Sequence, residues 1–457
     1  MANTEKFLGF LSQFPNYPSE QLDAVRREFF SGLSNCVYAD WTGAAVPASN
    51  LIDSHSEFLK NYLIGNPHSH HAPSALAMSY AKQARAEVLK FFKADPDEYE
   101  VIFTPNATGA ILLLQNYMFE GGDLLLTADN HNSVNGLRET AKRFGAIVRY
   151  APIDNDLKIM DSELERALTY PRSTHNKLFC YPAKSNYSGT LHSLDWVAYA
   201  QERGWDVMLD AAAYSANNRL DLSKIKPDFV PISFYKIFGY PTGCGCLIIK
   251  KEKYAKLNKR FFSGGSILLV SVMKDFFAPE TIGYARFEDG TINFAAMQAI
   301  ANGLQFIDSL GNYKDRVISI ASWLRNELNG LNENGNSVII HSPEGSDTVT
   351  FSIAQGSSCN IVDAWEFEKF ANEHKVYVRT GCFCNPGVNE KLFGYEIDTY
   401  EKFYNDAILP DQITIENLRK YSDDKPIGAI RASFGYANNF RDVEKFAEVT
   451  RMFLKQL

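Results

Sequence analysis

Helical and strand-like hydrophobic patterns alternate along the chain from about residue 79. In 79–92, Ala81, Ala84, Val88 and Phe92 recur at helical spacing, which predicts a helix with one buried face. The following segments are predicted in the same way: strands at 101–104, 123–127, 146–153, 178–183, 205–214 and 230–234, and helices at 107–118, 133–145, 162–168 and 193–204. Because the connections are short, this alternation predicts βαβ units and a mostly parallel sheet with helices on both faces.

Two helix ends carry recognisable signals. The helix at 107–118 is expected to end before Gly121, and the helix at 162–168 is expected to begin with a capping box formed by Ser162 and Glu165.

After about residue 300 the pattern changes. The segment 303–329 is predicted to be one long helical stretch, and isolated strands follow at 337–342 and 348–354. The first 35 or so residues are expected to be helical and to pack against this part. We therefore predict an α/β protein in which 38–300 form a large domain and 1–37 with 301–457 form a smaller α+β domain.

Composition narrows the class of protein. The 457 residues carry a net charge of −8, and 45% are hydrophobic, as in an ordinary folded protein. The acidic balance argues against a nucleic-acid or membrane partner, since both favour basic patches. Seven cysteines are a poor disulfide framework, and neither a signal peptide nor a long apolar span is visible, so we expect free thiols in the cytoplasm.

Three segments of the first part could carry chemistry. PNATG (105–109) joins a strand to a helix, where backbone N–H groups and Thr108 can bind an anion, although a plain helix cap is the alternative. Asp210 ends an apolar strand, at the sheet edge where ligands gather, or it simply caps the next turn. Lys236 follows a strand and has apolar neighbours, which lower the pKa of a lysine and favour a Schiff base; an exposed lysine is the alternative.

Together these segments suggest one cofactor. Pyridoxal 5′-phosphate needs an anion site for its phosphate, an acid beside its pyridine nitrogen and a lysine for its aldehyde. Ser233, three residues before Lys236, could bond a phosphate oxygen, and His131 could stack on the cofactor ring.

A fourth segment, RTGCFCNPG (379–387), is predicted to be a loop. A cysteine near the positive charge of Arg379 has a stabilised thiolate and is therefore reactive. Buried structural thiols, or a zinc site that joins Cys382 and Cys384 with Cys244 and Cys246, are the alternatives. His68, His70 and His71 lack a carboxylate partner and helical spacing, so we predict a loop there and no metal site.

These motifs resemble a known family. From YADWTGAAVPAS to FGYANNF, about residues 38–440, the chain resembles the class V pyridoxal-phosphate enzymes, and within them the cysteine desulfurases. DFVPISFYKIFGYPTG, RFEDGTINF and RTGCFCNPG most closely resemble the N-terminal desulfurase domain of molybdenum cofactor sulfurases. The resemblance implies transferase fold type I, with a mostly parallel seven-stranded sheet in the large domain.

The resemblance also implies roles for single residues. Lys236 matches the Schiff-base lysine, Asp210 matches the acid on the pyridine nitrogen, and His131 matches the stacking histidine. Asn186 matches the residue that bonds the phenolic oxygen of the cofactor, and the phosphate contacts are matched by Ala107, Thr108 and Ser233, with Thr291 matching the residue that reaches the phosphate of a partner subunit. Cys384 matches the persulfide carrier, and Arg431, with Arg379, matches the substrate-binding arginine. A homodimer, L-cysteine as the amino-acid substrate and a sulfur acceptor of unknown identity follow from the same resemblance.

The chain departs from the family pattern at two positions. Tyr235 stands where cysteine desulfurases usually have histidine before the lysine, and Ala213 stands where many have glutamine or histidine. We also expect no room for the C-terminal domain of the sulfurases. The sequence thus predicts a desulfurase that forms a cysteine persulfide and releases L-alanine. A C–S lyase, epimerase or aminotransferase of the same family, and a non-catalytic sulfur-carrier or zinc scaffold, are the alternatives.

Overall fold

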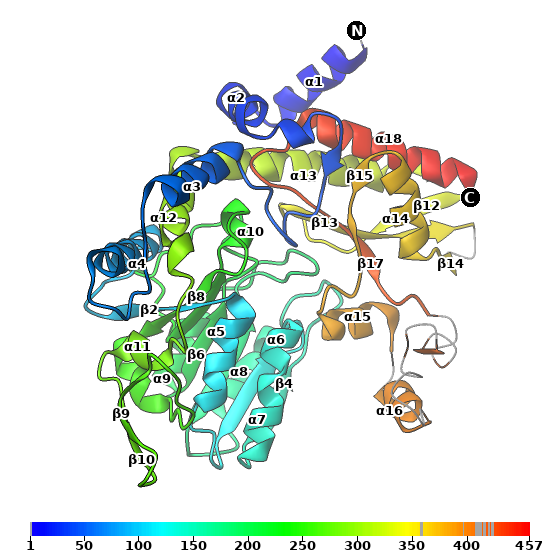
Figure 1. The fold of residues 1–457 in the computed structure, drawn as a ribbon. Helices are drawn as coiled ribbons and strands as arrows, with labels where there is room; N and C mark the ends of the chain where they lie inside the picture. The colour runs from blue at the N-terminus through cyan, green and yellow to red at the C-terminus, as the bar shows by residue number, and fades with distance from the viewer. Residues whose placement is uncertain are drawn as a thin grey trace.

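A computed structural model describes residues 2–356, 360–395, 397–406, 414, 417–418, 421 and 425–457 (Figure 1). The described α-helices are α1 (Ala2–Gln13), α2 (Glu20–Phe29), α3 (Ser49–Asn61), α4 (Ala72–Phe91), α5 (Ala107–Leu113), α6 (Asn132–Asn135), α7 (Leu137–Arg143), α8 (Asp161–Thr169), α9 (Trp196–Glu202), α10 (Tyr235–Phe238), α11 (Gly283–Phe287), α12 (Met297–Ser309), α13 (Tyr313–Asn329), α14 (Ala364–Glu373), α15 (Pro386–Phe393), α16 (Ile397–Asp406) and α18 (Phe440–Gln456). The described strands are β1 (Val37–Tyr38), β2 (Tyr99–Thr104), β3 (Asp123–Thr127), β4 (Ile147–Ala151), β5 (Lys177–Pro182), β6 (Asp206–Asp210), β7 (Phe229–Ser233), β8 (Gly245–Lys250), β9 (Ile267–Ser271), β10 (Phe276–Pro279), β11 (Asn332–Glu333), β12 (Asn336–Ile340), β13 (Thr348–Gln355), β14 (Asn360–Ile361), β15 (Val376–Tyr377), β16 (Arg379–Gly381) and β17 (Ala429–Ser433).

The large sheet has seven strands in the order β2-β8-β7-β6-β5-β3-β4. Only β8 runs against its neighbours, so the carboxyl ends of β2, β3, β5, β6 and β7 lie along one edge. The predicted mostly parallel sheet is therefore confirmed. This edge carries the candidate site, as expected for an open α/β sheet.

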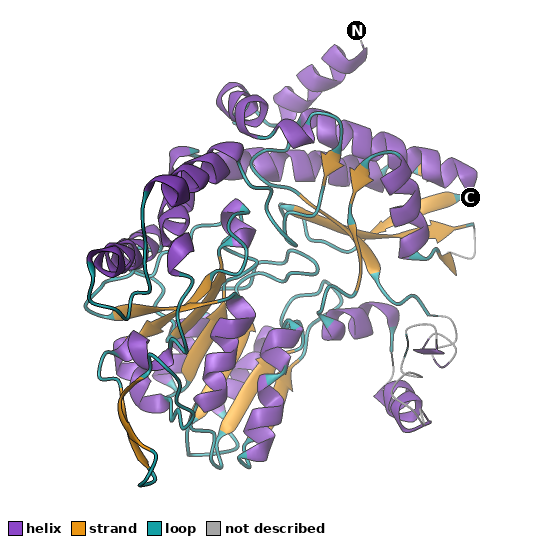
Figure 2. Ribbon diagram, viewed as in Figure 1, coloured by secondary structure: helices purple, strands orange, loops and turns teal. Residues whose placement is uncertain are grey.

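Helices cover both faces of this sheet, and the strands supply side chains to two separate cores (Figure 2). Along β5, Leu178 and Cys180 join one core while Phe179 and Tyr181 join the other. Because successive strand side chains point to opposite faces, continuous apolar runs such as this one fit a sheet covered on both sides.

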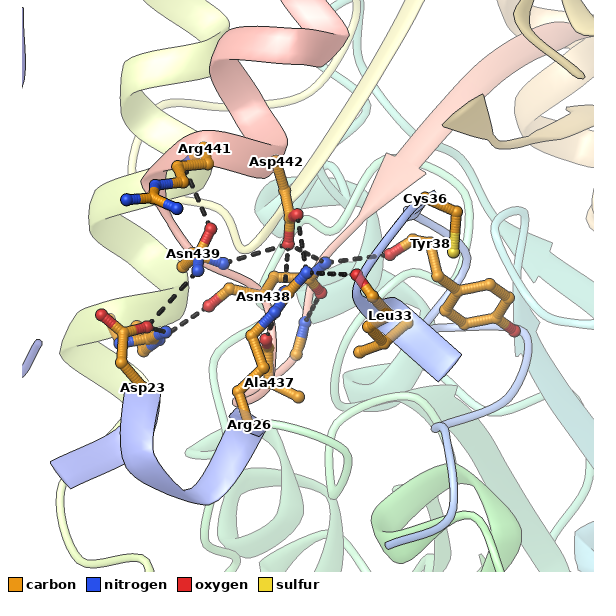
Figure 3. Close-up of polar contacts among 12 residues, drawn as sticks. Asp23, Arg26, Leu33, Cys36, Tyr38, Ala437, Asn438, Asn439, Arg441 and Asp442 are labelled. Carbon is orange, nitrogen blue, oxygen red and sulfur yellow. Dashed lines mark hydrogen bonds and ion pairs between the residues drawn. The ribbon is translucent and has the colours of Figure 1, made fainter. Parts of the chain in front are cut away.

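The second sheet is mainly antiparallel, in the order β11-β12-β13-β17-β16 with β14 beside β13, and α13, α14 and α18 pack against it (Figure 1). The N-terminal helices form as predicted and lie on α13 and α18. Phe10 packs on Phe440 with ring centroids 4.8 Å apart, and Arg26 donates to Asp442 at 2.5 and 3.0 Å. Figure 3 shows the polar contacts between the N-terminal segment and the start of α18, here called the N-terminal clasp. In this clasp Arg26 bonds to Asp442, and Asn438 donates to the Tyr38 carbonyl at 3.0 Å.

Several predicted boundaries are wrong, and the helix predicted at 133–145 is divided into α6 and α7. The stretch 303–329 is two helices, because the chain turns at Gly311, which has a φ of +65°. The helix from Ala107 ends at Leu113 and continues as one 3₁₀ turn, and the strand from 205 ends at Asp210. Helix α8 begins at Asp161, so Ser162 lies inside its first turn and makes no cap.

Helix α12 clarifies why one long helix does not form. It packs on α3 and α4, beside the large sheet, and its Gly303 lies so close to Phe238 that a Cβ atom would stand 2.3 Å from that ring. Helix α13 instead packs on α18. A straight helix through 303–329 could not reach both surfaces, and the assignment of residues to two domains stays a prediction.

No helix in the described part of the chain is both long and apolar enough to cross a membrane. The β9–β10 hairpin extends away from the body of the molecule, at the lower left of Figure 1, and Val272 and Met273 at its tip are each 94% exposed.

Candidate active site

A cavity of about 140 Å³ opens at the carboxyl edge of the large sheet. Its lining comes from the ends of β5, β6 and β7 and from the loops after β2 and β3, and it comprises Asn106, Ala107, Thr108, Ile111, His131, Ser133, Pro182, Lys184, Asn186, Asp210, Ala212, Ala213, Ser233, Tyr235 and Lys236. The structure thus brings together seven of the eleven residues predicted as cofactor, catalytic or substrate contacts: Ala107, Thr108, His131, Asn186, Asp210, Ser233 and Lys236. The four outside this lining are Thr291, Arg379, Cys384 and Arg431.

Lys236 and Asp210 both line this cavity. Asp210 is the last residue of β6 and is 8% exposed, and one of its oxygens accepts from Ala212 N–H at 3.0 Å. Lys236 lies in the short helix α10, directly after β7. Burial lowers the pKa of Lys236, and the Asp210 charge opposes this only in part. The predicted direction of this pKa shift is confirmed, so the neutral amine is easier to form than in water.

Three hydroxyl groups also line the cavity, those of Thr108, Ser133 and Ser233. Ser233 Oγ accepts from Ala107 N–H at 2.8 Å, which ties the end of β7 to the start of α5. Thr108 Oγ1 lies 2.8 Å from Ser133 Oγ, so α5 and α6 present a hydroxyl pair. Ala107 leaves space beside them. Such a group of hydroxyl and N–H donors is suited to a phosphate.

His131 caps helix α6 at the cavity wall. Its Nδ1 accepts from Ser133 N–H at 3.1 Å, which fixes the ring. Burial lowers the pKa of His131, and the nearby Lys236 charge lowers it further. Both effects favour the neutral form of the ring.

The loop that carries Cys384 reaches this wall from the second sheet. Asn132 N–H donates to the Cys384 carbonyl at 2.8 Å, and Asn186 Nδ2 donates to the Phe383 carbonyl at 2.7 Å. Phe383 and Cys384 both adopt left-handed backbone, with φ of 53° and 56°. Cys384 is exposed, whereas Phe383 is buried. The loop therefore presents the Cys384 side chain to solvent beside the cavity entrance.

Asn385 fixes this loop, and the sequence analysis missed it. The side chain is fully buried, and its Nδ2 donates to the Asp129 carbonyl at 2.7 Å and to Asn186 Oδ1 at 3.0 Å. Its Oδ1 accepts from Val388 N–H at 3.4 Å at the start of α15. An asparagine before a proline is a helix-start signal, so the cap could have been predicted from the sequence.

Arg379 and Arg431 lie opposite each other in neighbouring strands β16 and β17. Directly opposed residues of an antiparallel pair point to the same face. Arg431 is 2% exposed and donates to the Asn186 carbonyl at 2.8 Å and to Asp40 Oδ1 at 2.5 Å. Its bond to Asn186 connects it directly to the cavity lining.

Thr291 lies away from the cavity of its own chain. It is exposed, and Asn66 Nδ2 lies 3.3 Å from its Oγ1. The expectation that it reaches a partner subunit remains a prediction. Among the described residues, no group of three or more His, Cys, Asp or Glu side chains is arranged to hold a metal ion. Cys244 and Cys246 are buried at the start of β8, in contrast to Cys384.

The donor set fits the cofactor expected from the sequence. A lysine amine, a buried carboxylate and three hydroxyl groups line the cavity. Ala212 and Ala213, whose side chains are small, also line the cavity. At Ala213 the chain offers no polar contact, as its departure from the family pattern predicts.

Comparisons with known proteins agree with this site. The model of the family "Aminotransferase class-V" matches residues 37–446. Molybdenum cofactor sulfurase of Solanum lycopersicum is 33% identical over 96% of this chain, and that of Homo sapiens is 31% identical over 94%. The chain spans 58% and 51% of the length of these two relatives.

Solved structures support the fold. A cysteine desulfurase of Thermococcus onnurineus NA1 superposes with a TM-score of 0.78 at 21% identity, covering 96% of this chain and all of that one. The cysteine desulfurase CsdA of Escherichia coli superposes with a TM-score of 0.77 at 19% identity, with the same coverage. The predicted fold type is confirmed.

Proposed function

Since the chain belongs to the class-V aminotransferase family, we propose that it binds pyridoxal 5′-phosphate and acts as a cysteine desulfurase. The observation that carries the proposal is the meeting of the Cys384 loop with the lysine cavity, through the Asn132 and Asn186 hydrogen bonds. An aminotransferase needs no cysteine at this place. The likeness to molybdenum cofactor sulfurases supports the same reaction.

The proposal assigns the side chains that line the cavity to particular parts of the cofactor. Thr108, Ser133 and Ser233 would hold its phosphate, Asp210 its pyridine nitrogen and Lys236 its aldehyde. When bound, pyridoxal phosphate supplies an electron sink that stabilises negative charge at the Cα atom of an amino acid. His131 would cover one face of the ring, and Asn186 would lie at its edge.

The side chains of this chain then perform three tasks. Arg431 holds the substrate carboxylate, because a buried guanidinium can donate two parallel hydrogen bonds. Lys236 takes the Cα proton as a neutral amine, since burial lowers its pKa. The Cys384 thiolate attacks the sulfur of L-cysteine. A new S–S bond forms, the C–S bond breaks, and the electron pair of the C–S bond stays with the carbon skeleton, which takes up a proton and leaves as L-alanine.

The direct test measures products. The purified protein is incubated with L-cysteine, and alanine, sulfide and pyruvate are assayed together with the visible spectrum. Alanine in amounts equal to the persulfide plus sulfide supports the proposal. Pyruvate or another keto acid would instead show a C–S lyase or aminotransferase, and a colourless protein with bound zinc would show a scaffold.

Two substitutions separate the cofactor from the sulfur chemistry. Lys236→Ala should abolish the visible absorbance of the lysine-bound cofactor. Cys384→Ala should keep that absorbance and stop persulfide formation, and Cys382→Ala is its matched control in the same loop. If Cys384→Ala still loads sulfur at the original rate, the assignment of the persulfide to Cys384 is wrong.

We also propose that two copies of the chain associate, with Thr291 near the second copy. The exposed apolar tip of the β9–β10 hairpin supports this, because exposed apolar patches of this kind mark interaction sites. The base of the hairpin joins the Thr291 loop, where Gly290 N–H donates to the Gly264 carbonyl at 3.0 Å. Val272→Asp with Met273→Asp should convert the dimer to a monomer in light scattering after size exclusion. Leu8→Asp in α1, at an exposed apolar residue far from the hairpin, should not.

A further inference from the structure

Asp40 brings a carboxylate to the two arginines of the candidate site. Its Oδ1 accepts from Arg431 Nη2 at 2.5 Å, and its Oδ2 lies 4.0 Å from Arg379 Nη1. The Asp40 side chain is 20% exposed and that of Arg431 is 2% exposed, whereas that of Arg379 is 46% exposed. The contact with Arg431 is therefore shielded from water, and the contact with Arg379 is at the solvent edge.

The backbone around Asp40 is held between β15, which ends just before Arg379, and β17, which carries Arg431. Val37 and Tyr38 pair with β15, just before Arg379, and Ala39 N–H donates to the Tyr377 carbonyl at 2.8 Å. On the other side, Ser433 N–H donates to the Ala39 carbonyl at 2.8 Å, and Thr42 N–H donates to Ser433 Oγ at 2.9 Å. The clasp of Figure 3 adds the bond from Asn438 to the Tyr38 carbonyl. Hydrogen bonds to the segments on both sides therefore fix the position of Asp40.

Gly43 leaves the space that the carboxylate occupies. A Cβ atom on Gly43 would lie 2.4 Å from Asp40 Oδ2 and 2.7 Å from Oδ1. Both contacts are shorter than side-chain atoms tolerate, so any other residue at 43 would displace the carboxylate. The turn also binds the Lys236 helix, because Ala45 N–H donates to the Tyr235 carbonyl at 3.1 Å.

Arg431 keeps donors for a ligand despite these contacts. Its Nη1 is bonded to the Asn186 carbonyl and its Nη2 to Asp40. Its Nε is buried and has no hydrogen-bond partner among the described residues. A guanidinium has five N–H donors. Two acceptors orient the guanidinium of Arg431, and its Nε–H still lacks an acceptor. One substrate carboxylate would complete it.

We propose that Asp40 is a positioning residue that orients Arg431 and sets the site to accept amino acids with a single carboxylate. This inference rests on the proposed function. Two guanidinium groups and one carboxylate leave one net positive charge, which one substrate carboxylate balances. A second anionic group on the side chain of the substrate would meet Asp40 without a free positive charge. The substrate class is thereby limited to amino acids without a second anionic group.

The test compares two amino acids that carry no sulfur, so it does not depend on desulfuration. The cofactor-loaded protein is titrated with L-alanine and L-aspartate, and each Kd is taken from the change in visible absorbance. Asp40→Asn should improve the binding of aspartate relative to alanine by about tenfold, the effect expected from one charge roughly 10 Å away near a protein surface. Arg379→Gln removes the opposite charge and should shift the same ratio the other way.

Asp221→Asn is the matched control, since Asp221 is paired with Lys93 on the surface at 2.9 Å and lies outside the site. It should leave the ratio unchanged. A purely structural Asp40 predicts a lower melting temperature with an unchanged ratio, and that result in Asp40→Asn would overturn the proposal. If Asp40→Asn does not fold, an unchanged ratio in Arg379→Gln would overturn it equally. If L-alanine changes no spectrum in the unmodified protein, the proposed function itself fails.

Discussion

Replacing Asn385 with alanine should uncouple sulfur transfer from amino-acid binding. The change removes two hydrogen bonds from Nδ2, to Asp129 and Asn186, and the cap at Val388 N–H. Each buried hydrogen bond contributes about 1 kcal/mol and the cap about 1 kcal/mol, so the free energy of unfolding should fall by about 3 kcal/mol.

The effect on the loop follows from its backbone. Left-handed backbone costs about 1–2 kcal/mol per residue, hence about 2–4 kcal/mol for Phe383 and Cys384 together. Without Asn385, the bonds from Asn132 and Asn186 remain, and they contribute about 2 kcal/mol in total. Because this no longer exceeds the backbone cost, Cys384 should leave its position for much of the time.

The assay follows persulfide formation on Cys384 in single-turnover experiments, beside the Kd for L-alanine and urea unfolding. We expect a loss in rate of about tenfold or more with an unchanged Kd. Asn439→Ala is the matched control, because it removes another helix cap, at Arg441 N–H, far from the loop. An Asn385→Ala variant that is less stable but forms persulfide at the original rate would refute this account of the loop.

Three further predictions concern stability and binding. Asp347→Asn should cost about 3 kcal/mol in urea unfolding, because it leaves Lys184 buried without its ion-pair partner. Burial lowers the pKa of His341 to about 4, so its unfolded form binds the extra proton between pH 4 and about 6.5. Stability should therefore fall as pH drops through that window, and His341→Gln should flatten the fall in pH-dependent unfolding curves; an equally steep fall would contradict the assignment. Gly43→Ala should weaken L-alanine binding by displacing Asp40 while the bound cofactor keeps its visible absorbance, and an unchanged Kd would contradict the argument from close packing.

Local sequence patterns were enough to predict the site residues that lie at the ends of strands. Asp210, Ser233 and Lys236 come at or just after apolar strands, and parallel strands bring their carboxyl ends to one edge, so their meeting could be predicted. His131 could be proposed because it follows the strand at 123–127, whereas Asn186, in a loop that no periodicity describes, came from the resemblance to a family.

Other features depend on contacts between distant segments. Asp40 has no local signal, because its role comes from pairing with Arg431, 391 positions later. The break at Gly311 was missed because the helical pattern continues across it, although α12 and α13 pack on different surfaces. Ser162 and Glu165 have the spacing of a capping box, but the N-cap is Met160, two residues before Ser162, so no capping box forms.

The long separation between Asp40 and Arg431 also has a consequence for synthesis on the ribosome. At about 5–20 residues per second, roughly 20 to 80 seconds pass between the two residues leaving the catalytic centre of the ribosome. Every residue that lines the cavity, up to Lys236, is made within that interval. Until residues 376–377 are made, β1 lacks both flanking strands, and throughout the interval the Arg431 guanidinium that would receive a substrate does not yet exist. A nascent chain could therefore complete the cofactor cavity long before it can select an amino acid.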